Sequence, residues 1–330
     1  MPLPELTMRF DLRVPAFAGT TYATQYQAAL DMAAWADGIG VETIVVSEHH
    51  GDPAGFMSAP FVVAAAMLGR TSRVGVTVSA ALAPLHDPVR FAEQLATIDC
   101  MAPGRLSVVL GAGYRRAEFD MAGVDRAQRG RLVEECYAVC RKAWTGEPFE
   151  WRGQTVLVTP TPATPAGPHL AIGGKTEVAA RRAARLGAPF APATADPALT
   201  ACYRAECARR GVAPIVEGLG DKPMRPGFVM VAHDPDATWA QISGLARYDA
   251  ETYASWQDDS VHSDWVVRNV EQVDDLRTSG RYVVLTPAQC VEQVRGDGGI
   301  SLHPLMGGIS PDLAWESLRL FESAVLPEIV

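Results

Sequence analysis

The sequence lacks several features that identify common classes of protein. Its six cysteines show no CxxC spacing, which argues against a zinc site and against a disulfide framework. No apolar run approaches the roughly 18 residues that a membrane-spanning helix needs, and no basic segment leads into an apolar core as in a secretory signal. Lysine and arginine form no cluster that could track nucleic-acid phosphates, and the formal net charge is −9. We therefore expect a cytoplasmic protein without disulfides, bound metal, nucleic-acid partner or membrane contact.

Two local patterns are weaker than they look. Cys136 and Cys140 lie four residues apart on an expected helix, a spacing that could hold a metal, but a thiol pair facing the core is the commoner arrangement. The Arg-Arg pairs at 115–116, 181–182 and 209–210 stand alone, and we expect them to be solvated on helices or loops. Neither pattern indicates a ligand site.

Strand and helix signals alternate along the whole chain of 330 residues. Short β-branched runs, typical of buried parallel strands, are each followed by a helical pattern, and 48% hydrophobic residues are ample for a large core. The expected strands lie at 6–13, 42–47, 73–78, 105–110, 169–172, 188–192, 226–232 and 299–304. Eight such units predict an α/β fold, a closed (β/α)8 TIM barrel, formed by a single domain over residues 1–330.

Three helix starts are marked by a capping side chain that precedes a proline. They are Asp87-Pro88, Thr286-Pro287 and Ser310-Pro311. The side-chain oxygen can accept from a free amide of the first turn, and proline suits the first helical position because it has no amide hydrogen to satisfy. We expect a helix to begin at each of these prolines.

Two segments exceed what a minimal barrel needs. Residues 145–168 combine a short polar-aromatic stretch with many prolines and predict a hairpin followed by an irregular connection. Residues 234–285, between the seventh and eighth expected strands, predict an insertion that covers the catalytic face as a lid. The aromatic side chains of that insertion either line a substrate pocket or cover the core: Tyr248, Tyr253, Trp256 and Trp265.

Titratable side chains gather where the second expected strand ends. Glu48, His49 and His50 follow it directly, and the carboxyl ends of strands are where α/β barrels carry their chemistry. Neighbours on an extended chain point to opposite faces, so one imidazole should face the barrel mouth while the other hydrogen-bonds elsewhere. A neutral imidazole is suited to proton transfer, and Glu48 either orients it or forms a separate ion pair. His86 and His303 are expected to have structural roles.

Small residues follow three further strands, and they predict that a flat ligand approaches the backbone closely. At residues 173–176, free amides at a helix N-terminus, one ammonium and one hydroxyl could bind an anion. The spacing is not that of a P-loop, so a nucleoside triphosphate is not implied, and the alternative is that the glycines only shape a tight turn. The candidate cofactor-binding positions are Ala80, Ala81, Gly111, Gly113, Tyr114, Gly173, Gly174, Lys175 and Thr176.

Several short segments, spread over essentially the whole chain, match motifs of one protein family. They are Ser47-Glu-His-His, Leu85-His-Asp-Pro-Val-Arg-Phe-Ala-Glu-Gln, Pro103-Gly-Arg-Leu, Gly111-Ala-Gly-Tyr with Glu118-Phe119, Ile172-Gly-Gly, Pro304-Leu-Met-Gly-Gly and Ala314-Trp-Glu-Ser-Leu-Arg-Leu-Phe. Each is weak alone, but their order and spacing are specific. On these motifs the chain resembles the bacterial-luciferase-like monooxygenases, a family that also includes deazaflavin (F420)-dependent reductases.

The resemblance implies a barrel that binds reduced FMN, or F420, at the carboxyl ends of its strands. It makes His49 the catalytic histidine that assists proton transfer around flavin and substrate. It puts the flavin phosphate at residues 173–176 with Arg129 or Arg131 nearby. It also implies a non-prolyl cis peptide bond around Ala80-Ala81, against the flavin.

This chain departs from the luciferase α subunit after the fourth strand, where Gly111-Ala112 replaces Cys-Arg. The lost arginine removes a phosphate ligand, which fits transient capture of reduced FMN from a separate flavin reductase, or F420 with its longer anionic tail. We therefore expect a flavin-dependent monooxygenase that uses reduced FMN and O2 on a small organic substrate. The alternatives are an F420-dependent reductase or dehydrogenase and a non-catalytic flavin-binding homologue. Family members are commonly dimers, so we also expect a homodimer.

Overall fold

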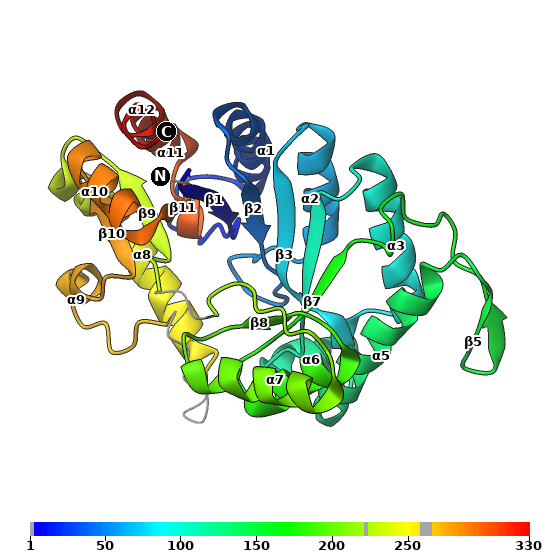
Figure 1. Ribbon diagram of the computed structural model, residues 1–330. Coiled ribbons are helices and arrows are strands. Elements are labelled where there is room, and N and C mark those ends of the chain that lie inside the picture. Colours follow the sequence, from blue (N-terminus) through cyan, green and yellow to red (C-terminus); the bar gives the residue numbers. More distant parts are fainter. Residues whose placement is uncertain (1–2, 221–223, 258–265) are drawn as a thin grey trace. The chain divides into compact units, whose positions relative to one another are not determined.

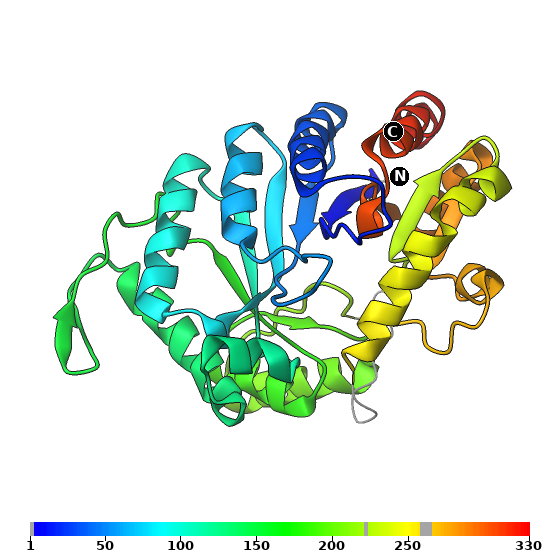
Figure 2. The same ribbon diagram turned by 180° about the vertical axis from the view of Figure 1, so that it is seen from behind.

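The computed structural model describes residues 3–220, 224–257 and 266–330. Its chain forms two compact units. The first unit is made of the described parts of Met1–Val45, Asp52–Met57 and Pro223–Val330, and the second is made of those of Val46–Gly51 and Ser58–Lys222. Each unit combines strands with helices (Figures 1 and 2).

Parallel strand pairs organise the first unit. β1 pairs with β11, with Glu5 opposite Gly299, and β9 pairs with β10, with Phe228 opposite Tyr282. The strands are β1 (Glu5–Phe10), β9 (Phe228–Val231), β10 (Tyr282–Leu285) and β11 (Gly299–Leu302). The helices are α1 (Tyr22–Ile39), α8 (Pro235–Ser255), α9 (Val273–Thr278), α10 (Pro287–Asp297), η3 (Met306–Gly308), α11 (Pro311–Leu320), η4 (Phe321–Val325) and α12 (Leu326–Ile329).

Four adjacent parallel strands organise the second unit, in the order β3-β4-β7-β8. The strands of this unit are β3 (Gly75–Leu82), β4 (Leu106–Gly111), β5 (Phe149–Trp151), β6 (Gln154–Val156), β7 (His169–Gly174) and β8 (Phe190–Pro192). The helices are α2 (Pro60–Gly69), η1 (Ala83–Leu85), α3 (Pro88–Met101), α4 (Arg116–Ala122), η2 (Arg126–Gln128), α5 (Arg129–Ala143), α6 (Glu177–Leu186) and α7 (Pro197–Arg210).

The chain is an α/β protein with a seven-stranded parallel sheet. Together with β2 (Thr43–Val46), the strand order of this sheet is β11-β1-β2-β3-β4-β7-β8. Alternating residues of β4 such as Leu106, Val108 and Leu110 are at most 1% exposed, and burying one such side chain contributes about 1.5–3 kcal/mol. The sheet holds seven strands where the sequence predicted eight, so the closed eight-stranded barrel stays a prediction.

Each expected strand range overlaps an observed strand, but one further strand was not predicted. β10, Tyr282–Leu285, lies inside the segment 234–285 that was expected to be a lid insertion. That segment also contains α8 and α9. Residues 258–265, which include Trp265, lie outside the described residues. The predicted hairpin is present as the antiparallel pair β5–β6, which lies at the edge of the second unit, outside its sheet (Figures 1 and 2).

The three marked helix starts are confirmed. Asp87 accepts from the amides of Val89 and Arg90 at the start of α3. Thr286 forms a capping box with Gln289 at the start of α10. Ser310 caps α11 by accepting from the Leu313 amide, and proline is the first residue of all three helices.

A buried charged cluster follows β1 in the first unit. The Arg13 side chain is fully buried; its Nε and Nη2 donate to Asp11 over 3.1 and 2.8 Å, and Asp249 of α8 forms a second ion pair. The rings of Phe56 and Tyr253 lie 5.0 and 5.1 Å from the guanidinium carbon. Burial opposes the charged form of Arg13, but Asp11, Tyr253 and Tyr282 together outweigh this and raise the pKa of the guanidinium. The cluster ties α8 to the end of β1.

Candidate functional site

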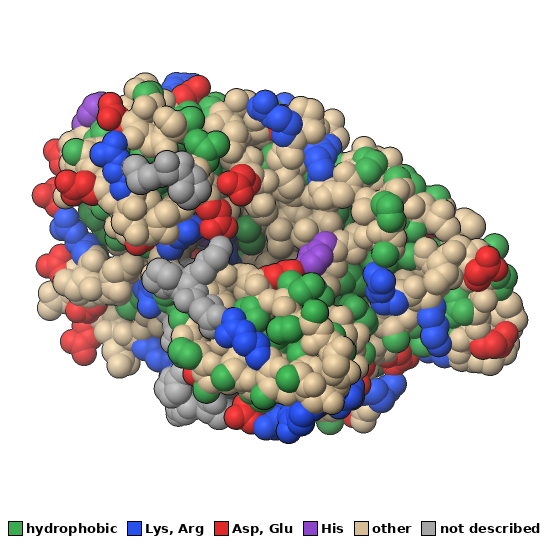
Figure 3. All heavy atoms as spheres, in the orientation of Figure 1, with side chains coloured by type: hydrophobic (Ala, Val, Ile, Leu, Met, Phe, Trp, Pro, Cys, Tyr) green, Lys and Arg blue, Asp and Glu red, His purple; other side chains and the backbone are tan. Residues whose placement is uncertain are grey.

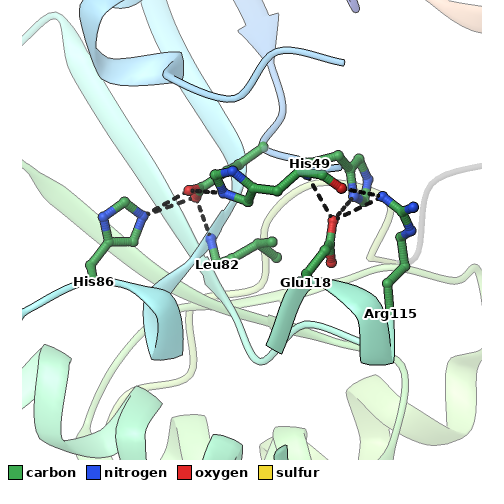
Figure 4. A network of polar contacts seen from close by, with 7 residues as sticks. His49, Leu82, His86, Arg115 and Glu118 are labelled. Carbon is green, nitrogen blue, oxygen red and sulfur yellow. Dashed lines mark hydrogen bonds and ion pairs between the residues drawn. The ribbon is translucent and has the colours of Figure 1, made fainter. Parts of the chain in front are cut away.

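The polar residues after β2 belong to a hydrogen-bonded network in the second unit (Figure 4). Nδ1 of His49 lies 2.9 Å from Oε1 of Glu118. Nε2 of His50 lies 2.9 Å from Oε1 of Glu48. The two imidazoles thus reach different carboxylates, in keeping with their adjacent places on extended chain. The carboxylate bonded to His49 is Glu118, and Glu48 binds the neighbouring ring.

Glu118, in the first turn of α4, gathers three donors on a single oxygen. Its Oε1 accepts from Nδ1 of His49, from the His50 amide over 3.1 Å and from Nη1 of Arg115 over 3.3 Å. Its Oε2 is buried and has no hydrogen-bond partner. A buried carboxylate oxygen without a donor is costly, so a donor group of a bound ligand would be favoured at this position.

Glu48 is a buried anion with its own set of donors. Its Oε2 accepts from the Leu82 amide over 2.6 Å, and its Oε1 accepts from Nε2 of His50 and Nε2 of His86, each over 2.9 Å. Burial by itself would raise the pKa of this carboxyl, but the hydrogen bonds from the two imidazoles and the amide lower it to about 2. The hydrogen bond to Glu48 in turn raises the pKa of His50, against the opposing effect of burial.

Tyr114 lies between His49 and Lys175, the residue that follows β7. The rings of His49 and Tyr114 meet edge to face, with centroids 5.8 Å apart, and Nζ of Lys175 lies 5.7 Å from the centroid of the Tyr114 ring. These residues follow β2, β4 and β7, three parallel strands of the sheet. The fold therefore brings together one imidazole, one phenol and one ammonium that are far apart in sequence.

Protein neighbours explain why glycine stands at three of the candidate positions. A Cβ at Gly174 would lie 2.4 Å from Cβ of Ala179, and one at Gly173 would lie 2.7 Å from the Val109 side chain. A Cβ at Gly111 would lie 2.8 Å from Cβ of Ala80. Gly173 and Gly174 are the last residues of β7 and Gly111 is the last residue of β4, so close packing of protein atoms against these strands accounts for the glycines without a ligand.

The anion-binding groups expected after β7 are partly in place. Thr176 is the N-cap of α6, and its hydroxyl oxygen accepts from the Ala179 amide, which leaves its hydrogen free to be donated. The amides of Glu177 and Val178, the first two residues of α6, belong to the first turn, whose amides have no partner within the helix. Together with the ammonium of Lys175, they form a donor set that fits a phosphate.

The arginines do not all behave as expected. Arg131 is exposed and donates to Glu135 over 2.6 Å, and Arg129 donates to the Arg126 carbonyl over 3.0 Å. Arg115 was expected to be solvated, but its side chain is only 10% exposed because it donates to the His50 carbonyl and to Glu118. The expectation for Arg115 was wrong because an Arg-Arg pair in the sequence does not show which of the two side chains is covered by other residues.

One non-prolyl peptide bond in β3 is cis. It is Ser79–Ala80, one bond before the expected Ala80–Ala81. The pairing register between β3 and β4 shifts between Ser79 and Ala81.

Other features of the described residues bear on the classes considered above. All six cysteines are free thiols, and Cys136 and Cys140 are buried as expected. Within residues 3–220, 224–257 and 266–330, no group of three His, Cys, Asp or Glu side chains could hold a metal ion. None of the helices in these ranges combines the length and the apolar character needed to cross a membrane. Positive and negative side chains are interspersed over the face shown in Figure 3.

A family model described as luciferase-like monooxygenase matches residues 8–297. The chain belongs to this family of enzymes. Among curated relatives, 4-hydroxyprotoasukamycin monooxygenase from Streptomyces nodosus subsp. asukaensis is 30% identical over 118 residues, which are 36% of this chain and 32% of that protein. The chain spans less than half the length of the curated relatives it matches, with 40% and 44% for two others.

Solved structures share the fold over 99% of this luciferase-like chain. Monooxygenase RslO1 from Streptomyces bottropensis has a TM-score of 0.77 at 20% identity and is covered over its full length, 100%. The oxygenating constituent of 3,6-diketocamphane monooxygenase from Pseudomonas putida, in complex with FMN, has a TM-score of 0.70 at 17% identity and 99% coverage. An F420-dependent secondary alcohol dehydrogenase with an F420-acetone adduct has a TM-score of 0.66 at 16% identity and 99% coverage.

Proposed function

We propose that this protein is a flavin-dependent monooxygenase that uses reduced FMN and O2 to oxygenate a small organic substrate. Membership of the luciferase-like family supports the reaction class. The observation that carries the proposal is that the Tyr114 ring lies near both His49 and Lys175, so that a proton-transfer group and an anion-binding group would be close to each other. A reaction between a phosphate-bearing redox cofactor and a substrate needs a group that binds the phosphate and a group that transfers the proton.

His49 is the residue that would move a proton. With its Nδ1–H donated to Glu118, its Nε2 is left as the acceptor, so that Nε2 can take up a proton and return it. Glu118 stabilises the imidazolium form while the proton is held. Both oxygens of Glu48 accept hydrogen bonds from His50, His86 and the Leu82 amide. Glu48 is therefore proposed to support the reaction indirectly, through these residues.

The residues present fit a flavin phosphate at the start of α6. Lys175 would supply the positive charge, and Thr176 and the amides of the first turn would supply hydrogen-bond donors. Ala80, Ala81, Gly111, Gly113 and Tyr114 are proposed to border the flavin ring, and Arg129 or Arg131 to assist with the phosphate. Reduced FMN, when bound, supplies the electrons with which O2 is activated.

The remaining parts of the proposal concern assembly. The chain would form a closed (β/α)8 barrel as one domain over residues 1–330, with 234–285 as a lid. A separate flavin reductase would deliver reduced FMN, and two copies would form a homodimer in the cytoplasm.

An F420-dependent reductase or dehydrogenase is the second candidate. Gly111-Ala112 takes the place of the arginine that would bind a flavin phosphate, and the F420-dependent dehydrogenase shares the fold. Anaerobic titration with reduced FMN and with F420, followed by admission of air, separates the candidates. Oxygen consumption that differs from the spontaneous oxidation of reduced FMN alone supports the monooxygenase, and turnover without oxygen supports the F420 enzyme. Flavin binding without any turnover would leave a non-catalytic homologue.

Replacement of His49 tests the assignment directly. His49→Asn or His49→Ala should lower the turnover number on the order of 10²-fold, because proton transfer by a positioned base contributes about this much. Oxygen consumption with reduced FMN is the measurement. His169→Gln is the matched control, since His169 is a partly exposed histidine bonded to Glu217 at the opposite end of β7. An unchanged rate in both His49 variants would refute the role of this imidazole.

A further inference from the structure

His50 connects the two carboxylates of the network. Its ring donates to Glu48, its amide donates to Glu118 over 3.1 Å, and its carbonyl accepts from Arg115 over 2.8 Å. Figure 4 shows His86 at one end of the network and Arg115 at the other. The ring of His50 is therefore bonded to Glu48, which precedes His49, and its main chain is bonded to α4 and its N-cap.

The backbone around His49 is held from both directions as a result. On one side, Glu48 is fixed by the Leu82 amide at the end of β3 and by His86 before α3. On the other side, the main chain at residue 50 is fixed by Glu118 and Arg115 of α4 and its N-cap. The hydrogen bond from the His50 ring to Glu48 links these two sets of contacts.

We infer that His50 is a positioning residue, whose bonds to Glu48, Glu118 and Arg115 hold His49 with Nδ1 towards Glu118 and Nε2 towards the site. The inference rests on the proposed role of His49 as the proton-transfer group. It assigns His50 a part in the reaction although its own ring is turned to Glu48.

Geometry gives the reason that such support matters. Residues 47–51 follow β2 without helical or strand structure, and the Glu48 amide still donates to the Ala80 carbonyl of β3 over 3.3 Å. A displacement of about 1 Å at a reacting group can cost on the order of 10²-fold in rate. Beyond that bond, the hydrogen bonds of His50 to Glu48 and Glu118 hold the chain that carries His49.

Two substitutions at His50 separate positioning from bulk. His50→Gln keeps an amide donor that can reach Glu48, whereas His50→Leu keeps volume and removes the donor. We expect His50→Leu to lower kcat on the order of tenfold with little change in KM for reduced FMN, and His50→Gln to restore most of the loss. His169→Leu and His169→Gln are the controls, because His169 also donates from Nε2 to a carboxylate, Glu217, at the other end of the sheet.

Nitrogen NMR of histidine-labelled protein supplies a readout that does not depend on turnover. We expect the His49 ring to show one tautomer, protonated at Nδ1, in the native protein and in His50→Gln. In His50→Leu the two ring nitrogens should move towards averaged values, and the His169 variants should leave them unchanged.

A folded His50→Leu protein whose His49 resonances and kcat both equal those of the native protein would overturn the inference. So would a loss that His50→Gln fails to restore. If His50→Leu does not fold, His86→Leu removes a different donor from Glu48 and must shift the same His49 resonances in the same direction. If the native protein turns over neither reduced FMN nor F420, the proposed function fails, while the resonances of His49 still decide whether His50 positions it.

Discussion

Two polar clusters, one in each unit, use buried carboxylates in different ways. In the first unit, Asp11 and Asp249 enclose Arg13, a cation that does not titrate, and aromatic rings close the cluster. In the second unit, Glu48 and Glu118 bind imidazoles, and the rings of His50 and His86 remain 20% and 21% exposed.

The choice of cation separates a structural cluster from a chemical one. A guanidinium keeps its charge at every pH of interest, so the bonds around Arg13 fix α8 without any change of state. An imidazole can gain and lose its proton near neutrality, so the hydrogen bond from His49 to Glu118 orients a ring of a kind that can transfer protons. Substitutions in the two clusters should therefore affect different measurements.

The largest effect is expected from Arg13→Met, which breaks the structural cluster. It leaves Asp11 and Asp249 buried without their cation, and removing one partner of a buried ion pair costs about 3–5 kcal/mol. Urea denaturation measures the free energy of unfolding. The control is Arg247→Met in α8, whose exposed ion pair with Glu251 should contribute about 0.5 kcal/mol or less. Equal losses in the two variants would show that the Arg13 cluster is not structural.

Acid should weaken the two clusters at different pH values. Burial lowers the pKa of His303, 3.9 Å from Asp11, from 6.5 to about 4. The folded state thus binds fewer protons than the unfolded state between these values, so stability is complete above pH 6.5 and falls as pH drops through 4. For Glu48, whose pKa falls from 4.5 to about 2, stability is complete above pH 4.5 and falls as pH drops through 2.

Each of these two groups accounts for on the order of 3 kcal/mol across its window. Unfolding free energies measured at pH 7, 5.5 and 4.5 should decline in the native protein and decline less in His303→Gln. A native protein whose stability stays constant from pH 6.5 to 4.5 would contradict the assignment to His303.

The smallest effect is expected from Glu118→Gln, which tests the chemical cluster. Glutamine still offers one oxygen to the His50 amide and to Arg115, so the fold should persist, while the charge that stabilises protonated His49 is lost. Turnover should fall on the order of tenfold, because His49 loses the negative charge beside its ring and is held less firmly. Glu134→Gln, which alters a carboxylate bonded to Arg182 and Arg185, is the control with unchanged turnover. A normal rate in Glu118→Gln would show that the charge of this carboxylate does not contribute to the reaction.

Local signals were sufficient for most elements of the fold. Asp87, Thr286 and Ser310 cap helices where the sequence predicted them, because a cap is a contact between residues three positions apart. The strand β10 was not predicted because the segment 234–285 was interpreted as an insertion. Tyr282–Leu285 is a short β-branched run, and this pattern predicts a strand.

The candidate site was predictable only in part. Adjacent histidines on extended chain had to face different partners, and they do so through Glu118 and Glu48. Which carboxylate serves which ring was not predictable, since Glu118 lies 69 residues from His49 along the chain. The segment Glu118-Phe119 stood among the family motifs, and this was the one signal that could have drawn attention to it.

The sequence by itself determined the alternation of strands and helices, the helix starts and the family, because these depend on periodicity, capping and the order of motifs. Only the tertiary structure decided that Glu118 is hydrogen-bonded to His49, that Arg115 is largely covered and that Tyr114 lies near both His49 and Lys175. The physical reason is that hydrogen bonds between distant residues depend on where parallel strands end in space, and no local pattern encodes that position.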